Sequence, residues 1–235
     1  MLTLITLEWK KHRAGIALRN AILLCAVLGL FLFALCYLGI ANDPETGVPD
    51  AAPGNNTISA PIELFTGMAY LIFPSAMLAS YVVTPCRDGT MGLLFTYPIS
   101  RRKLVMAQLL AVWIFSFAAL AATKLAIYGV IRLAAPYLEA SFPLDYSMAS
   151  PGFYCQLLLK SAVTVTLSFL ALFVGLVLRS SRATLLTAFL LIFLTQGSVG
   201  NWTLSQSALV PVVLAVLSLL CALWCVLRLE RMDIN

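Results

Sequence analysis

The sequence has very few of the side chains on which enzymes and soluble domains depend. Its 235 residues include one histidine, His12, and only 10 Asp and Glu beside 15 Lys and Arg. Charged residues make up 11% of the chain, whereas soluble domains have about 25%. One histidine supplies neither a multi-histidine metal site in the membrane nor a Ser–His protease centre. We therefore expect no catalytic residue, no metal site and no enzymatic activity on this chain.

Other absences narrow the class of membrane protein. There is no GxxxxGK[ST] motif, so the chain does not bind ATP through a phosphate loop. No Asp or Glu falls near the middle of an apolar run, where transporters driven by protons or sodium usually carry a carboxylate. The six cysteines form no CxxC motif, and we read them as small apolar residues rather than as a disulfide framework.

Long apolar runs fill nearly all of the chain, and 61% of its residues are hydrophobic. A membrane-spanning helix needs about 20 mostly apolar residues. We predict an all-α integral membrane protein whose single transmembrane domain, residues 1–235, has six transmembrane helices. The predicted spans are residues 14–40, 62–86, 104–135, 152–178, 183–199 and 208–229.

The positions of the basic residues predict the orientation. If both termini are cytoplasmic, the outer side holds only Lys124, Arg132 and Lys160 of the 15 basic residues, together with six acidic ones. Basic residues are retained on the cytoplasmic side during insertion. We therefore expect a multi-pass protein of the plasma (inner) membrane with both ends inside. The positive net charge reflects this topology and does not indicate nucleic-acid binding.

Two segments outside the spans allow two interpretations each. Residues 1–13 form either an interfacial helix, with Trp9 at the headgroups, or an inward extension of the first span. The uncharged polar segment 195–207 is either a plain outer loop or a re-entrant turn, which would need protein or water around its backbone. Asn55 and Asn201 are formal glycosylation sequons on the outer side.

Four residues are candidates for a translocation path: Lys124, Lys160, Gln196 and Asn201. Lys124 lies about 30 Å along the third span, which predicts a place at the outer interface. Lys160 is the deepest basic residue, about 13 Å beyond Gly152. It either extends to the headgroups or faces a cavity, where Glu139 or Asp145 would pair with it.

The segment RDGTMGLLFTYPISRRK, residues 87–103, interrupts the apolar runs with a short amphipathic insert. With Asp88 as a helix cap, Met91, Leu94 and Phe95 share one helical face, and Pro98 ends the helix. Arg101, Arg102 and Lys103 then form a basic edge at the membrane surface, where anionic lipid attracts them. The apolar face either rests on the inner leaflet or fits a groove of a cytoplasmic partner.

The insert resembles the first cytoplasmic loop of the type-two ABC exporter permeases. That loop typically has a charged residue, a small-residue GT pair, leucines, a proline and then Ser-Arg before a long third span; here it reads RDGTMGLLFTYPISRRKLVMAQLL. The opening LITLEWKKHR is also similar to that family's lead-in. This sequence departs from the family in having Arg87 where an acidic residue is common, and in lacking any large extramembrane domain.

The resemblance implies a function and a set of partners. The insert would be a coupling helix that docks on a separate ABC ATPase through Asp88, Gly89, Met91, Leu94, Phe95 and Tyr97. Residues 1–13 would be a connecting helix and 195–207 an outer hairpin. ATP and Mg would bind the ATPase dimer, and this chain would pair with a second permease subunit, identical or different. The alternative function is an ATPase-independent membrane facilitator or assembly scaffold, and the sequence leaves the substrate open.

Overall fold

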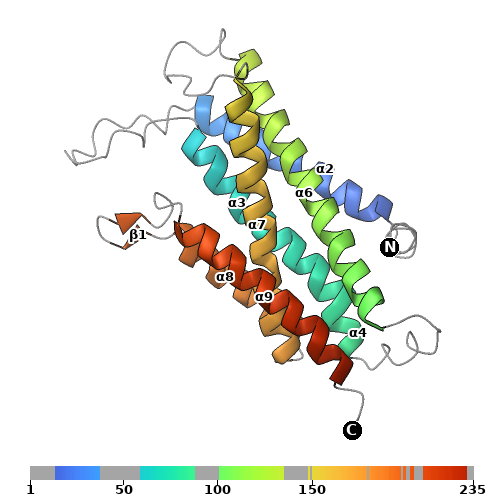
Figure 1. Cartoon of the computed structure of the whole chain (residues 1–235). Coiled ribbons are helices and arrows are strands. Elements are labelled where there is room, and N and C mark those ends of the chain that lie inside the picture. The colour runs from blue at the N-terminus through green and yellow to red at the C-terminus, as the bar shows by residue number, and fades with distance from the viewer. Residues whose placement is uncertain are drawn as a thin grey trace.

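A computed structural model of the chain describes residues 14–37, 59–87, 101–134, 148, 150–178, 180–196, 198–199, 202–203 and 209–231. Its helices are α2 (Ala14–Tyr37), α3 (Ser59–Leu78), the π-helix η2 (Ala79–Val83), α4 (Thr84–Arg87), α6 (Arg101–Ala134), α7 (Pro151–Val177), α8 (Ser181–Gln196) and α9 (Leu209–Arg231). Two two-residue strands, β1 (Ser198–Val199) and β2 (Trp202–Thr203), pair antiparallel. The described part is thus a helical protein with one very short hairpin (Figure 1).

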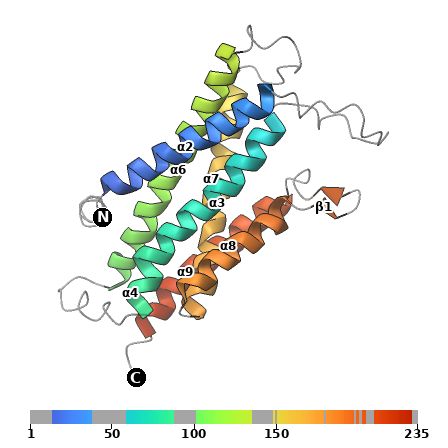
Figure 2. The ribbon, with the colours of Figure 1, turned by 180° about the vertical axis from the view of Figure 1, so that it is seen from behind.

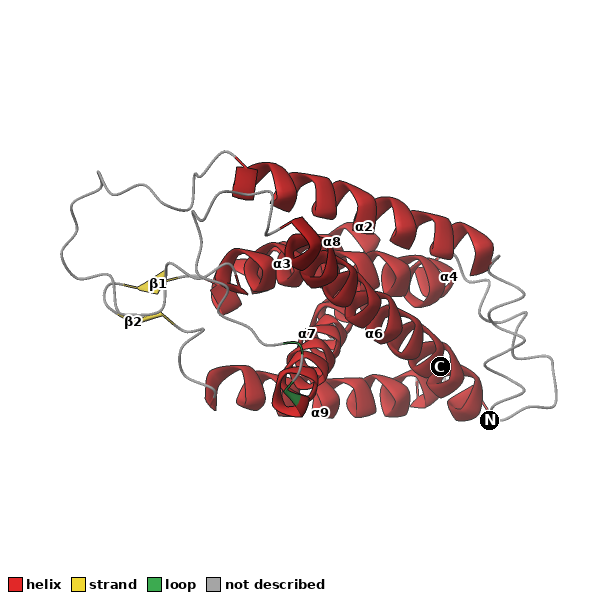
Figure 3. Cartoon of the chain, turned by 90° about the horizontal axis from the view of Figure 1, so that it is seen from above, coloured by secondary structure: helices red, strands yellow, loops and turns green. Residues whose placement is uncertain are grey.

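The helices pack around α7, which contacts α3, α6, α8 and α9 (Figures 1 and 2). Helix α2 lies at one edge of the molecule (Figure 3). Its Tyr37 end is near the Ser59 end of α3, and the two helices diverge toward the Ala14 end of α2, as Figures 1 and 2 agree. Most of the surface of α2 is therefore left uncovered by the rest of the chain.

Four helical stretches in the described part are long and apolar enough to cross a membrane: Gly15–Leu35, Pro61–Val83, Val105–Ala134 and Pro151–Val177. These stretches coincide with the first four predicted spans. The other two apolar stretches, Ser181–Thr195 and Val212–Cys225, are shorter. Helix α8 has 16 residues and is about 24 Å long, which is less than the roughly 30 Å of a hydrocarbon core. A membrane protein is thus established, while the count of six spans stays a prediction.

The second predicted span differs from a regular α-helix. Helices α3, η2 and α4 follow one another without a break from Ser59 to Arg87. Pro74 lies inside α3, where proline supplies no N–H for the helical ladder. Five residues further on, η2 changes to the π-helical hydrogen-bond register, so that Thr84 N–H donates to the carbonyl of Ala79. The sequence pattern did not predict this change.

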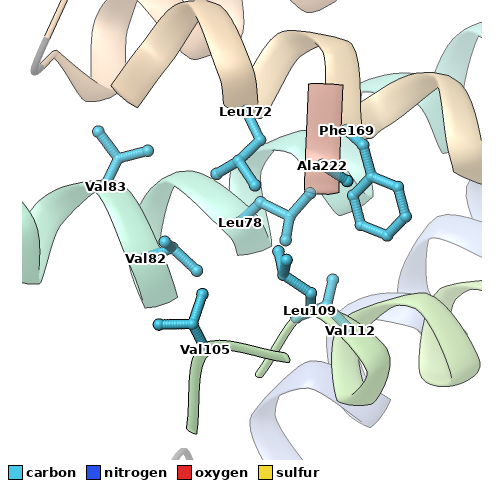
Figure 4. Packing of buried hydrophobic residues seen from close by; sticks show 9 residues of the cluster. All are labelled: Leu78, Val82, Val83, Val105, Leu109, Val112, Phe169, Leu172 and Ala222. Atoms are coloured by element: carbon cyan, nitrogen blue, oxygen red, sulfur yellow. The ribbon is translucent and has the colours of Figure 1, made fainter. Parts of the chain in front are cut away.

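One apolar cluster joins the helices at the end of the bundle where α4 ends and α6 begins (Figure 4). Its buried members are Leu78, Val82, Val83, Val105, Leu109, Val112, Phe169, Leu172 and Ala222. They come from α3, η2, α6, α7 and α9. Because lipid tails are as apolar as these side chains, the cluster holds the helices together mainly through close packing.

Several helix ends that carry basic residues lie together in the structure. The C-terminal ends of α4 and α9, the start of α6 and the turn between α7 and α8 lie at one end of the bundle (Figures 1 and 2). Arg101, Arg102 and Lys103 occupy the first turn of α6, as predicted. Arg132 lies in the last turn of α6, at the opposite end. Which side of the membrane each end faces remains a prediction.

The polar segment 195–207 is described only in part. Thr195 and Gln196 end α8, and β1 and β2 pair in the register Ser198 with Thr203 and Val199 with Trp202. Figures 1 and 2 both show this hairpin beyond the ends of α8 and α9, away from the other helices. The choice between an outer loop and a re-entrant turn stays a prediction.

Helices α7 and α8 approach each other very closely at Gly175. A Cβ atom added to this glycine would overlap Thr184 Oγ1 and lie 3.0 Å from Thr184 Cβ. The Gly175 carbonyl also accepts the backbone N–H of Ser180 in the turn between the two helices. Glycine is favoured at position 175 because the Thr184 side chain of α8 occupies the space that a side chain would need.

We predict that Gly175→Ala destabilises the protein, because overpacking of this kind costs about 1–3 kcal/mol. The melting temperature of the detergent-solubilised protein should fall by several degrees. Gly129→Ala is the control, since a Cβ at that helical position meets no atom within 4 Å. It should be neutral or slightly stabilising. Equal melting temperatures for the two variants would contradict the close contact.

Candidate functional site

The charged and polar contacts between helices are concentrated where α3 faces α6. Lys124 Nζ of α6 forms a salt bridge of 2.6 Å with Glu63 Oε2 of α3. One turn or more away, the Tyr70 hydroxyl lies 2.7 Å from Thr123 Oγ1 and donates to the Ala119 carbonyl at 3.3 Å. We call Glu63, Tyr70, Thr123 and Lys124 the polar seam.

Helical geometry explains why these four side chains meet. Glu63 and Tyr70 are seven residues apart, which is close to two turns, so they lie on one stripe of α3. Thr123 and Lys124 are adjacent in α6 and reach the two α3 residues at neighbouring levels. Because α3 and α6 run in opposite directions (Figure 1), one register brings both pairs together. A shift of one residue would separate them.

The ion pair is strongly but unequally buried. The Lys124 side chain is 1% exposed and that of Glu63 26% exposed. An ammonium group enclosed by protein loses its hydration, and only an opposite charge with good geometry restores that free energy. Lys124 therefore depends on Glu63 more than Glu63 depends on Lys124. Sequence reasoning placed Lys124 at the outer interface; the structure encloses its side chain between helices.

The candidate path residues do not form one site. Lys160 of α7 is exposed, yet close enough to Lys124 for their charges to interact. This fits a lysine on the surface of the bundle better than one in a cavity; its suggested partners Glu139 and Asp145 lie outside the described residues. Gln196 ends α8, and Asn201 lies outside the described residues.

The predicted coupling residues Asp88, Gly89, Met91, Leu94, Phe95 and Tyr97 also lie outside the described residues, as does the lead-in 1–13. The structure describes the helices on both sides of the insert instead. Helix α4 ends at Arg87 and α6 begins at Arg101. Both boundaries lie at the same end of the bundle (Figure 1).

Most buried hydroxyl groups are satisfied within their own helices. Thr66, Ser75, Ser161, Ser168 and Ser218 each donate to a carbonyl three or four residues earlier. Such hydroxyls contribute no specificity between helices. The polar seam differs from these hydroxyl groups because its bonds join two different helices.

Thr84 makes a second polar contact between helices. Its Oγ1 donates to the Ala79 carbonyl at 3.0 Å and lies 3.0 Å from Ser181 Oγ. The first contact is within the π-helical turn, and the second joins that turn to the start of α8. The residue that ends η2 is thus attached to a different helix.

Two buried polar atoms of α6 have no hydrogen-bond partner in the described part of the chain: Trp113 Nε1 and Ser116 Oγ. Both residues lie between Gln108 and the polar seam along α6, and Trp113 stacks on Phe117 with ring centroids 5.3 Å apart. Buried donors normally find a partner. The middle of α6 therefore has hydrogen-bonding groups available to a water molecule or to a polar group of a ligand.

No group of three or more His, Cys, Asp or Glu side chains that could hold a metal occurs in the described ranges. The one carboxylate of the seam is already bound to a lysine, so it is not available as a base without breaking that pair. The geometry defines a polar contact between α3 and α6.

Comparison with known proteins adds one relative. The chain is 20% identical over 236 residues to a Bacillus subtilis (strain 168) protein named "Uncharacterized protein YcbO". The alignment covers 99% of this chain and 100% of that protein. The likeness therefore extends over both whole chains, and that name gives no activity. No family model matches the chain, and no solved structure matches it.

The ion pair leads to a prediction of unequal effects. Glu63→Gln leaves a buried, unpaired ammonium and should cost about 3–5 kcal/mol. Lys124→Met leaves a partly exposed carboxylate and should cost less. The double variant Glu63→Gln with Lys124→Met should recover much of the loss, because no charge is then left unpaired. Thermal unfolding in detergent measures all three, and additive effects of the two single changes would contradict the coupling.

Proposed function

We propose that this chain is the membrane permease subunit of an ATP-driven exporter, and that a separate cytoplasmic ATPase docks on the insert at residues 88–97. The chain supplies the path through the membrane, and the partner supplies ATP hydrolysis. The likeness of the insert to permease loops suggests this function. The observation that carries it is the π-helical turn η2, which lies within the second span, near the end that leads to the insert.

The position of η2 suits a joint that transmits force. It contacts α3, α4, α6, α7 and α8, so a displacement of α4 reaches most of the bundle. π-Helical turns are rare and occur frequently at functional sites, because their wider register is less stable than an α-helix. Pro74 and Pro85 on either side lack the N–H that would stiffen the helix. Together these features make Ser59–Arg87 rigid at its outer half and adaptable near the insert.

The polar contacts provide two kinds of fixed point along this joined helix. At the far end, the polar seam attaches α3 to α6. Near the insert, Thr84 attaches the π-helical turn to Ser181 of α8. A movement of the insert would thus shift α8 through Thr84 while the polar seam holds α3 in register. Such differential contacts are what a switch between two accessible states requires.

Docking on the ATPase is tested by changing the apolar face of the insert. Leu94→Glu with Phe95→Glu should abolish co-purification of the proposed ATPase subunit from native membranes, because two carboxylates cannot enter an apolar groove without losing hydration. Membrane insertion should be unchanged. The control, Thr90→Glu with Thr96→Glu, adds the same charge outside the predicted face and should retain the ATPase. Co-purification that survives the Leu94 and Phe95 changes would sink the docking role.

Coupling through Thr84 is tested by an isosteric change. Thr84→Val removes the hydroxyl contacts to Ala79 and Ser181 and leaves the insert intact. The ATPase should still co-purify, and its hydrolysis rate in the proteoliposome complex should fall toward the rate of the isolated ATPase. Thr187→Val is the matched control, because the Thr187 hydroxyl bonds only to Ala183 of its own helix. If the two valine variants hydrolyse ATP equally fast, Thr84 is not part of the coupling.

A further inference from the structure

A groove of about 790 Å³ lies between α2 and α3–η2. It is present because the two helices diverge (Figures 1 and 2). On the α3–η2 side, the small residues Ala69, Ala76 and Ser80 alternate with the larger Phe73, Met77 and Tyr81. The facing side chains of α2, such as Leu24 and Val27, do not fill the space. The volume falls in the range of ligand sites, which is roughly 300–1,000 Å³.

The groove is mostly apolar, and its polar side chains lie toward one end. Asn20, Ser80 and Tyr81 lie at this end, which we call the polar end, beside Ile16 and Ala17, whereas Leu28 and Ala69 line the other end. Because α2 and α3 run in opposite directions, Asn20 lies toward the η2 end of α3. The polar end is thus the end of the bundle where α4 finishes and α6 starts with its basic edge. A ligand that fits has a polar head at this end and an apolar tail.

A cation stands beside the polar end. Arg19 precedes the groove residue Asn20 and its side chain is exposed. Within the described ranges Arg19 forms no ion pair; the salt bridge there joins Lys124 and Glu63. An arginine on an apolar helix extends toward the headgroups and is matched in shape and charge to a phosphate. The head of the ligand should therefore be anionic.

The length of the groove agrees with a lipid of one leaflet. From Ile16 to Leu28 the lining of α2 covers about 18 Å along the helix axis. Half of a hydrocarbon core is about 15 Å. A second copy of the chain is a poorer occupant, because an apolar helix would leave Arg19 without a counter-charge and cover the polar end.

We propose that this groove binds one anionic phospholipid, with an acyl chain between α2 and α3 and the phosphate beside Arg19 and Asn20. The lipid belongs to the leaflet next to the basic edge, where anionic headgroups are enriched on the predicted cytoplasmic side. The bound lipid contacts the π-helical turn at Ser80 and Tyr81 and so supports it. This inference does not depend on the ATPase, and it is tested on the permease chain alone.

Native mass spectrometry of the full chain from micelles with equal phosphatidylglycerol and phosphatidylcholine tests the proposal. The chain should retain one phosphatidylglycerol, preferred by about fivefold, which corresponds to about 1 kcal/mol for one arginine. Ala76→Phe fills the groove and should remove the bound lipid. Ala122→Phe is its control, because Ala122 is also an exposed helical alanine and does not line the groove.

The headgroup is tested separately. Arg19→Gln should reduce the preference for phosphatidylglycerol to nearly one, while Arg182→Gln, which removes the same charge from the exposed start of α8, should leave it unchanged. Equal retention of both lipids by the unaltered chain would overturn the proposal. So would retention that Ala76→Phe does not affect. A dimer that Ala76→Phe dissociates would identify the groove as a contact between two copies instead.

Discussion

The salt bridge between Lys124 and Glu63 is the interaction on which the arrangement of the helices depends. Hydrophobic burial cannot choose among registers when the surroundings are as apolar as the core, whereas a buried ammonium has only one acceptable position. That position fixes the rotation of α3 about its axis and its level along the bundle relative to α6. Because both helices also pack on α7, the register passes to the rest of the bundle. The apolar cluster at the opposite end then adds packing to an arrangement already chosen by charge.

The sequence was most informative about the positions of the spans and least informative about what joins them. The predicted fourth span, 152–178, agrees with α7, Pro151–Val177, because length and hydropathy determine a span locally. The partner of Lys124 was missed, since Lys124 and Glu63 were each assessed alone. Counting their depths on consecutive antiparallel spans would have placed them at similar levels. The π-helical turn had only Pro74 and Pro85 as signals, and the groove depends on the angle between α2 and α3, which hydropathy does not encode.

Helix α3 and its extension connect all the features with functional meaning. One face carries Glu63 and Tyr70 to α6, another lines the groove with Ala69, Ala76 and Ser80, and the end at Arg87 continues into the insert. A change at any of these places acts on the same helix. Under the two proposals above, the lipid next to α2 and the proposed ATPase would act on one shared element. The π-helical turn belongs to this element: it lines the groove through Ser80 and Tyr81 and is followed by α4, which ends at Arg87 before the insert.

The close contact of α7 and α8 also bears on how the short helix is held. Helix α8, with 16 residues, is too short to be a strong insertion signal by itself. It is joined to α7 by a turn of a few residues and meets α7 at Gly175, against which the Thr184 side chain packs closely. The short helix α8 is thus held in the bundle partly through its contact with α7 at residue 175.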